Sequence, residues 1–551
     1  MARVPMRRPL APVYLIFLLL AACTVGPDFE VPPTPPVKSL TAGPLPESVS
    51  AGGKTQRFVH GRDIPGDWWT LFHSKELAAL IERALRDNHD LHAVQAALRV
   101  AHANYRAQQG ALYPLVAGNL TSSDQKASTS VLSSPTVSGD PFYTLHTGQL
   151  TISYVPDVFG GIRRQVEAAA AQEESQFFML EALYLTLTSN IALAAIQEAS
   201  LRAQIEATKK ASDDERLLAD AGKNFGGAFQ SASARDWAAV RSALAQAEQS
   251  LPLLQKQLIA QRDLLTALTG HFAGEGLRER FTLSRLSLPK DVPLMLPSQI
   301  VEQRPDVRAA QANLHAAGAL VGVAIANRLP LFNLTGNVGR SGSQLGDLAN
   351  PAPPFLFWTA AGSVTQTIFD GFTLEQRQRA AEAGWDQVTE QYKSTVVTAF
   401  QNVSDALQAI KLDALSVDRA IRAETAAREN LCLTVAAFKS QVDKNKDITK
   451  DDRKTINDHF SIWWKSVCTR PQEIKVGEAK DGDSVPTGID VLTSEQLYLS
   501  TKLSRITAEA SRYADMVALY QALGGGWWNR FDVEGARDSS LSAGPRPWQK
   551  Q

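Results

Sequence analysis

The chain has 551 residues, and its 56 basic and 57 acidic side chains give a formal net charge of −1 at neutral pH. This balance argues against a nucleic-acid-binding protein, which usually carries a basic excess. The mean hydropathy of −0.16 argues against a polytopic helical membrane protein, but it is compatible with a β-barrel, whose strands alternate polar and apolar residues. The length exceeds the roughly 100–200 residues of one domain and allows a large or repeated core.

The first 23 residues have the layout of an export signal. Arginines at positions 3, 7 and 8 precede an apolar run over residues 10–20, which is shorter than the about 20 residues of a stable membrane-spanning helix. The run ends in Leu20-Ala21-Ala22-Cys23, which resembles a bacterial lipobox. That resemblance implies a signal peptide over residues 1–22 and acyl chains on Cys23, and Thr24 in place of aspartate is similar to lipoproteins sent to the outer membrane. The alternative is an ordinary signal peptide that is cut elsewhere.

Prolines follow the cysteine at high density, at positions 32, 33, 35 and 36. Proline favours an extended chain over a helix because it fixes φ and lacks an N–H group. We therefore expect residues 23–66 to form a lipid anchor and a proline-rich tether that runs from the membrane along the protein body.

The chain repeats itself. Residues 90–115 and 306–331 share 9 identities in 26 ungapped positions, although several of these are alanines. The order of features is stronger evidence, because each half runs helix, strand, loop, strand and very long helix. We expect a first repeat over 67–270, a linker over 271–297, a second repeat over 298–526 and a C-terminal tail over 527–551.

Four strands are expected. Residues 149–154, 332–338 and 358–368 alternate polar and apolar side chains, as half-buried strands do, and the first strand, near 112–122, is less regular. Segments of about 9–12 residues suit a tilted transmembrane strand, with Phe355, Phe357 and Trp358 at the interface. Four strands cannot close a membrane barrel, and an open edge in lipid leaves N–H and C=O groups unpaired, so other copies of the chain must complete it. The alternative is a soluble sandwich, which would require further strands, whereas the rest of the chain is expected to be helical.

Residues 162–218 and 372–438 contain no proline and are expected to form very long helices. At 1.5 Å per residue, about 60 residues reach roughly 90 Å. Residues 232–268 and 493–523 would return the chain toward the middle; each is followed by a glycine, Gly270 or Gly524, that stops a helix. Helices interleaved with strand hairpins favour a helical tube that continues a barrel, and the alternative is a free-standing coiled coil.

Four motifs in this order resemble the outer-membrane factors of tripartite efflux systems, the TolC-like and NodT-like lipoproteins. In chain order they are residues 20–29, Asp67-Trp68-Trp69 with Phe72, residues 303–310 and residues 519–527. With the repeat, the resemblance covers about residues 16–528. It implies a mixed α+β membrane protein: a homotrimer whose twelve-stranded β-barrel takes four strands from each chain and continues into a long periplasmic α-helical barrel with an equatorial band.

The same resemblance implies a passive exit duct in the bacterial outer membrane, which conducts small toxic compounds or drugs to the outside. Its partners would be outer-membrane lipid, a periplasmic adaptor protein and an inner-membrane transporter of RND type, with no cofactor besides the covalent lipid on Cys23. No Walker loop, GxGxxG motif or GxSxG elbow occurs, so we expect no enzyme. Two alternatives are an outer-membrane duct for protein secretion and a structural lipoprotein with coiled-coil arms.

In that family, polar and charged residues close the tube at its periplasmic tip. We expect the tip in a turn within residues 405–425, where the gate candidates are Asp405, Asp413, Asp418, Arg419 and Arg422. The matching bend of the first half is expected near Glu198 and Arg202. Like charges around a three-fold axis repel, whereas acid–base pairs latch neighbours, and protonation or adaptor binding would disturb either. The alternative for any one residue is a solvated helix face.

Residues 439–486 depart from the repeat and look like an insertion in the equatorial region. Residues 443–451 alternate like calcium ligands, but the loop lacks its characteristic glycine and glutamate, so calcium is not expected. His89 and His92 share a helix face without a second ligand cluster, so no metal is expected. Cys432 and Cys468 could form a disulfide in a compartment that permits one, or stay separate thiols.

Overall fold

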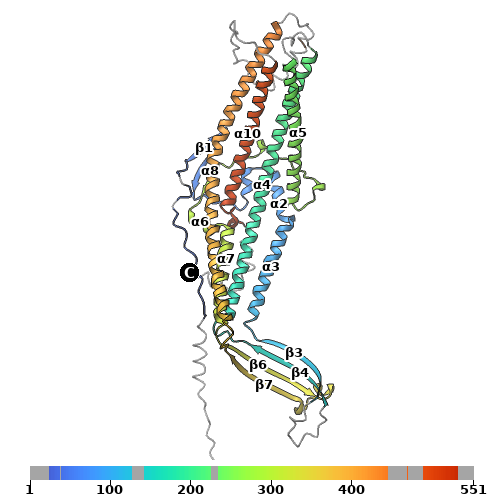
Figure 1. The fold of residues 1–551 in the computed structure, drawn as a ribbon, viewed down its shortest axis with the longest axis vertical. Coiled ribbons are helices and arrows are strands. Elements are labelled where there is room, and N and C mark those ends of the chain that lie inside the picture. The colour runs from blue at the N-terminus through green and yellow to red at the C-terminus, as the bar shows by residue number, and fades with distance from the viewer. Residues whose placement is uncertain are drawn as a thin grey trace, which may run out of the picture. The chain divides into compact units, whose positions relative to one another are not determined.

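The computed structural model describes residues 24–37, 39–41, 43–126, 142–224, 234–444, 454, 468 and 488–530. The chain divides into two compact units. The strand unit comprises Met1–Pro33, Ala93–Leu180 and Pro305–Val396, and the hairpin unit comprises Thr34–His92, Glu181–Arg304 and Val397–Gln551. The two longest helices in Figure 1, α4 (Gly161–Asn224) and α8 (Thr373–Lys444), contribute residues to both units.

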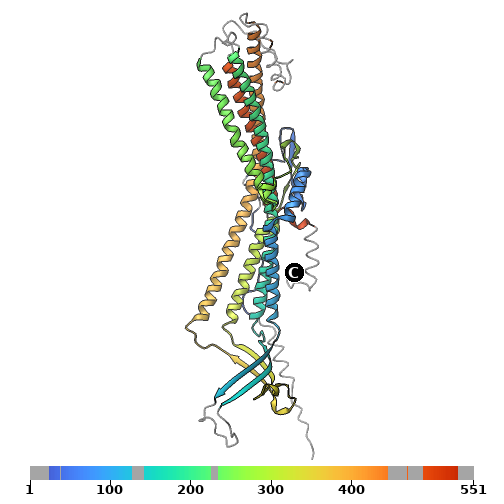
Figure 2. The ribbon, with the colours of Figure 1, turned by 90° about the vertical axis from the view of Figure 1, so that its right-hand side faces the viewer.

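The strand unit contains a four-stranded antiparallel sheet in the order β3-β4-β6-β7. Its strands lie side by side in Figure 1 and are seen from another side in Figure 2. The first half of the chain supplies α3 (His89–Gly110), β3 (Leu115–Lys126), β4 (Phe142–Tyr154) and then α4. The second half supplies α7 (Pro305–Ala326), β6 (Leu331–Gly342), β7 (Leu356–Thr365) and then α8, with η4 (Leu345–Ala349) and η5 (Pro353–Phe355) between the strands. The two halves therefore follow the order of features expected for a tandem repeat.

The strand ends differ from the alternating segments. β4 begins at Phe142, seven residues before the predicted start at residue 149. The prediction missed residues 142–148 because they mix polar and apolar side chains on both faces and show no clear period of two. β7 ends at Thr365, so the last residues of the segment 358–368 are not part of the strand.

The hairpin unit contains α5 (Ala234–Leu268) and α10 (Gly488–Ala522) together with its parts of α4 and α8. An ion pair between Arg216 and Glu248 at 2.7 Å joins α4 to α5, and Arg505 and Glu424 pair α10 with α8. The expected long helices and their return segments are confirmed. Gly270 and Gly524 follow α5 and α10 with φ of 78° and 90°, the left-handed conformation that ends many helices.

Three of the motifs that carry the resemblance meet in one core of the hairpin unit. Trp68 lies in η1 (Trp68–Phe72), is 1% exposed, and stacks on Tyr520 with ring centroids 5.4 Å apart. Arg304 donates to the carbonyl of Ala522 at 2.7 Å, and Trp527 donates through Nε1 to the carbonyl of Gln303 at 2.6 Å. The neighbouring short elements are α2 (Lys75–Asp87), η2 (Ala273–Glu275), η3 (Leu283–Arg285), α6 (Pro297–Gln303) and η6 (Trp527–Asn529).

A small sheet in the hairpin unit was not predicted. It joins β1 (Ser48–Ala51), β2 (Lys54–His60) and β5 (Asp291–Leu294) in that order. The expectation that everything outside the four alternating segments is helix or extended chain is therefore wrong for residues 23–66 and 271–297. A signal was present: Gly52 and Gly53 connect β1 to β2 with φ of 58° and 74°, and paired glycines are typical of a two-residue hairpin turn.

The turn predicted within residues 405–425 is wrong, as is the bend near Glu198. Both regions lie inside uninterrupted helices, α8 and α4. The physical reason is visible in the sequence: residues 405–425 contain neither glycine nor proline, so their charged residues mark polar positions on a helix.

The described start of the expected insertion, residues 439–444, continues α8 and does not lie beside the small sheet, where an equatorial position would place it. Ala51 of β1 packs against Ala414 and Val417 of α8, and the helical rise carries Lys444 roughly 40 Å further along the helix. The rest of the expected insertion, apart from residues 454 and 468, lies outside the described residues, so its placement stays a prediction. The calcium-like residues 445–451 lie outside the described residues, and the described residues contain no cluster of His, Cys, Asp and Glu suited to a metal.

Candidate functional site

The four-stranded sheet has two chemically different faces. Its pairing is one-to-one throughout, with Leu150 opposite both Gly118 and Val338, and Val338 opposite Trp358. Because neighbouring residues in a strand point to opposite sides, the even-numbered residues of all four strands share one face and the odd-numbered residues share the other.

The even-numbered face is apolar and exposed. Its large side chains include Leu120, Leu150, Leu334, Trp358 and Val364, which are 48–74% exposed. A soluble protein rarely leaves so many contiguous apolar side chains uncovered. This face therefore has the character of a surface that contacts lipid.

The odd-numbered face is polar. Its central rows run Asn119 with Gln149, and Thr151 with Asn337 and Thr359. Nδ2 of Asn119 donates to Oγ1 of Thr151 at 3.3 Å, so amides and hydroxyls bond to one another across strands. This face has the character of a water-filled lumen.

The two outer strands of the sheet, β3 and β7, each pair with one described neighbour. Their free edges expose backbone N–H and C=O groups, and an unpaired backbone group in hydrocarbon costs several kcal/mol. A sheet with a lipid-facing side therefore needs further strands at both edges, which only other copies of the chain would supply in the same geometry.

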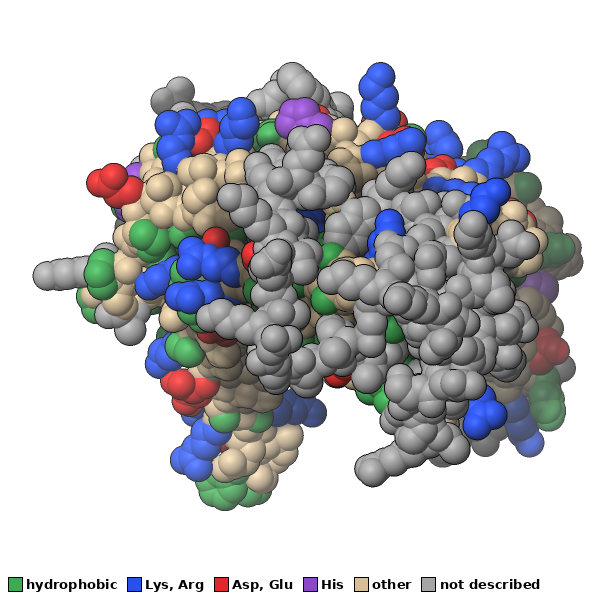
Figure 3. All heavy atoms as spheres, turned by 90° about the horizontal axis from the view of Figure 1, so that it is seen from above, with side chains coloured by type: hydrophobic (Ala, Val, Ile, Leu, Met, Phe, Trp, Pro, Cys, Tyr) green, Lys and Arg blue, Asp and Glu red, His purple; other side chains and the backbone are tan. Residues whose placement is uncertain are grey.

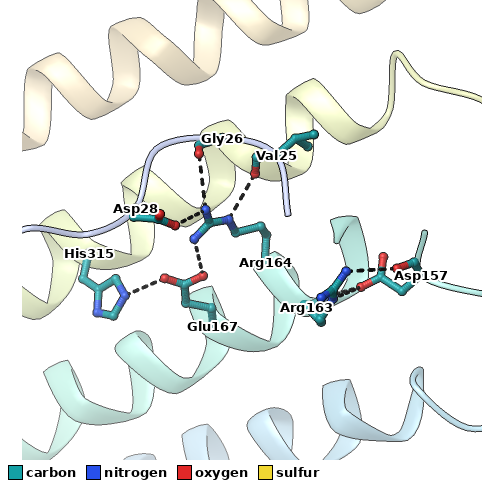
Figure 4. A network of polar contacts seen from close by, with 8 residues as sticks. All are labelled: Val25, Gly26, Asp28, Asp157, Arg163, Arg164, Glu167 and His315. Atoms are coloured by element: carbon teal, nitrogen blue, oxygen red, sulfur yellow. Dashed lines mark hydrogen bonds and ion pairs between the residues drawn. The ribbon is translucent and has the colours of Figure 1, made fainter. Parts of the chain in front are cut away.

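A buried arginine fastens the residues that follow Cys23 to the strand unit (Figure 4). Cys23 itself lies outside the described residues. The Arg164 side chain on α4 is 4% exposed; it donates to the carbonyls of Val25 at 3.1 Å and Gly26 at 3.3 Å, and to Asp28 at 2.6 Å. Its remaining nitrogen donates to Glu167 at 2.8 Å. We call these contacts the N-terminal clamp.

The second half of the chain completes the N-terminal clamp. His315 on α7 bonds to Glu167 at 2.8 Å, and its ring stacks on Phe29 with centroids 4.2 Å apart. Burial alone would raise the pKa of Glu167, but hydrogen bonds from His315 and Arg164 outweigh it and lower that pKa. Glu167 is therefore ionised at neutral pH and compensates the charge of Arg164.

Glycines allow the close approach of this segment. Gly26 has φ of 97°, and a Cβ there would lie 2.4 Å from Cα of Gly322 on α7. The N–H of Val25 donates to the carbonyl of Phe159 at 3.1 Å, and Thr24 packs against Gly160. The segment 24–29 is thus docked on the strand unit from its first described residue.

The five gate candidates do not form one cluster. Asp418 and Arg422 make an ion pair at 2.9 Å along α8. Asp405 contacts Gln401 on the same helix at 3.4 Å, and the Arg419 side chain is exposed. Whether any of them closes a channel stays a prediction. Among the described residues coloured in Figure 3, basic and acidic side chains lie interspersed, so charge alone does not single out a site among them.

Asp413 is the one candidate with a distinctive environment. It shares a hydrogen bond with Asp515 of α10, and burial together with this neighbour raises the pKa of Asp413 to about 7. Arg512 lies near it and is itself held by the small sheet, donating to Gln56 at 3.1 Å and to the carbonyls of Ala51 and Lys54. Sequence reasoning missed Asp515 and Arg512, because their approach to Asp413 is long-range.

We expect Asp413→Asn to remove a pH dependence of stability. The pKa of the carboxyl is 3.8 in the unfolded chain and about 7 in the folded protein. The protonated carboxyl therefore contributes fully to the free energy of unfolding below pH 3.8, and this contribution is lost as the pH rises through about 7. The variant should melt a few degrees higher than the parent at pH 8 and with a flatter pH profile. Thermal unfolding between pH 4 and 8 measures this. Asp418→Asn, which loses an exposed pair only, should keep the parental slope; an unchanged slope in Asp413→Asn would contradict the assignment.

Glu198, expected near a bend, is part of the hairpin-unit interior. Its side chain is fully buried and accepts from Arg202 at 2.7 Å, from Arg262 at 2.8 Å and from the N–H of Phe281 at 2.9 Å. A buried carboxylate with three donors fixes α4 against α5 and the segment that follows α5. Its role is structural.

The model of the family described as "outer membrane efflux protein" matches residues 80–271 and 296–445. The chain belongs to the outer membrane efflux protein family. Similar proteins include the probable efflux pump outer membrane protein TtgC of Pseudomonas putida, 25% identical over 530 residues that cover 95% of this chain and 97% of that protein. OprJ of Pseudomonas aeruginosa is 26% identical over 535 residues, covering 95% and 97%.

Solved structures share the fold. The outer-membrane channel OprN matches with a TM-score of 0.73 and 22% identity, covering 92% of this chain and 100% of that chain. The CmeC channel of Campylobacter jejuni matches with a TM-score of 0.73 and 20% identity, covering 94% and 98%. The predicted family and mixed α+β channel fold are therefore confirmed, and this member of the outer membrane efflux protein family is an outer-membrane exit duct of an efflux system.

Proposed function

We propose that three copies of the chain close a twelve-stranded barrel and that small toxic compounds leave the cell passively through it. The observation that carries the proposal is the sheet with one exposed apolar face, one polar face and two free edges. Closing such a sheet on itself pairs the edges, turns the apolar face to lipid and encloses the polar face.

The partners in this proposal are a periplasmic adaptor and an inner-membrane transporter of RND type, which supplies the energy. The duct itself carries out no catalytic step and binds no cofactor. Planar-bilayer recordings on purified, heat-modifiable trimers test the duct: discrete conductance steps are expected. A monomer, or trimers that conduct nothing, would reject it in favour of a structural lipoprotein.

Lipidation of Cys23 belongs to the same proposal. Docking on the strand unit holds the residues that follow the cysteine beside the start of α4. Acyl chains contribute about 0.8 kcal/mol per buried CH₂, so several chains anchor a protein firmly. Metabolic labelling with a fatty acid should mark the parent chain and not Cys23→Ser; labelling that persists in the variant would place the lipid elsewhere or reject it.

Two neighbouring alanines of β7 test which face contacts lipid. Ala360 lies on the even-numbered face opposite Gly336, and Ala361 lies on the odd-numbered face opposite Thr335. A lysine in lipid near the membrane midplane costs about 2–4 kcal/mol, so Ala360→Lys should strongly lower the amount of trimer recovered from outer membranes. Ala361→Lys is the matched control and should assemble nearly as the parent does. If Ala361→Lys instead yields much less trimer than Ala360→Lys, the odd-numbered face contacts lipid and the assignment of the two faces is wrong.

A further inference from the structure

The charged residues of the four strands all lie on one face. They are Asp124, Lys126 and Arg340, and all three carry even numbers. Each has a local partner near the loop ends of the sheet: Asp124 accepts from Thr144 at 2.6 Å, Lys126 lies 5.0 Å from the ring centroid of Phe142, and Arg340 donates to the carbonyl of Asn350. None belongs to the central rows.

The odd-numbered face of the described strands, by contrast, carries no Asp, Glu, Lys, Arg or His from residue 115 to 125, 143 to 153, 331 to 341 or 357 to 365. Its polar groups are amides and hydroxyls. They belong to asparagine, glutamine, serine, threonine and one tyrosine, and the central rows hold Asn119, Gln149, Thr151, Asn337 and Thr359.

Rings of charged side chains are a common way for a pore to select between cations and anions. Amides and hydroxyls both donate and accept hydrogen bonds, so they replace hydration water around solutes of either charge sign. A face made of these groups alone therefore presents no fixed charge to a passing solute.

We propose that the membrane-spanning part of the lumen has no fixed charge and admits polar small molecules whether they are neutral, cationic or anionic. The proposal rests on the proposed trimeric barrel, in which the odd-numbered face is enclosed. It assigns any charge discrimination to parts of the pathway outside these strands, and it makes Asn337 a position where one substitution would impose selectivity.

Asn337 is the position for the test because it lies in a central row, between Thr151 and Thr359. Asn337→Asp and Asn337→Lys each place a ring of three like charges in the trimer. The permeability ratio of potassium to chloride, from reversal potentials under a potassium chloride gradient, should rise about fivefold in the first variant and fall about fivefold in the second. Asn337→Gln is the uncharged control and should match the parent. Thr359→Asp and Thr359→Lys provide the same rings should the Asn337 variants not assemble.

Equal and opposite shifts of the permeability ratio are expected if the surrounding face is uncharged. A fixed charge already present there would reduce the effect of one substitution and not of the other. Unequal shifts in trimers of parental conductance would overturn the proposal. Unchanged ratios in both charged variants would also overturn it, since the face would then not line the pathway. Failure of the proposed duct is a separate result, because it appears as absent conductance in the parent trimer before any variant is compared.

Discussion

Replacing both Cys432 and Cys468 with serine should lower the free energy of unfolding of the hairpin unit by about 4 kcal/mol. The two residues form a disulfide, with Cα atoms 5.9 Å apart and a sequence separation of 36. A cross-link of this span removes many conformations from the unfolded chain, and the loop-closure model converts that into the stated value near 25 °C. The disulfide was one of two alternatives left open by the sequence, and the structure decides for the bond.

The bond joins two places that no local pattern connects. Cys432 lies on α8, 12 residues before the helix ends at Lys444, and both cysteines are buried, at 3% and 6% exposure. Cys468 therefore lies against α8 roughly 18 Å from that end, by the helical rise. Cys468 is thus tied to the helix on which the second repeat continues.

Denaturant unfolding followed by the fluorescence of the buried Trp68 and Trp69 measures the loss. Cys432→Ser, Cys468→Ser and the double variant should unfold at similar denaturant concentrations, because either single change already abolishes the bond. Reducing agent should shift the parent to the same value and leave the double variant unchanged. A parent that is insensitive to reductant while Cys432→Ser is destabilised would mean that packing at Cys432, and not the bond, stabilises the unit.

Much of this fold could be predicted because it is written in local patterns. Alternation over residues 332–338 and 358–368 predicts two strands. In the structure they pair without interruption, from Leu331 opposite Thr365 to Arg340 opposite Leu356. Long stretches without proline predict α4 and α8. The repeat could be found as well, since the order of elements is the same in the two halves.

What could not be predicted depends on contacts between distant residues. Arg164 meets Asp28 across 136 residues, and Asp413 meets Asp515 across about a hundred. A single charged side chain gives no sign of whether it will be buried, so the candidates between 405 and 422 looked alike in the sequence, and nothing there marked Asp413 as the one that meets Asp515. The resemblance led to the turn being placed among those charges, although the glycines at 222, 226 and 227 were the better helix-stop signal for the first half.

Arg164→Ala should free residues 24–29 from the strand unit and reduce its stability by on the order of 3 kcal/mol. The substitution removes the donors to Val25, Gly26 and Asp28. The Asp28 side chain is 91% exposed, so water can replace the hydrogen bond that Asp28 accepts from Arg164. Glu167, by contrast, loses its closest compensating charge inside the protein. Hydrogen exchange of residues 24–29 should become fast, while fatty-acid labelling at Cys23 should persist, because labelling requires the signal and not the clamp.

Arg163 is the matched control, since it is the adjacent residue of α4 and carries the same charge. Its side chain is 38% exposed and contacts Asp157, a carboxylate that also accepts the N–H groups of Ile162 and Arg163 at the start of the helix. Arg163→Ala should therefore cost about 1 kcal/mol or less and leave exchange in residues 24–29 slow. Arg164→Lys separates charge from geometry: a lysine keeps the charge beside Glu167 but cannot donate to three groups in a fixed fork, so exchange should be intermediate. Equal exchange rates in Arg163→Ala and Arg164→Ala would show that Phe29, Gly26 and the Val25 N–H hold the segment without the guanidinium.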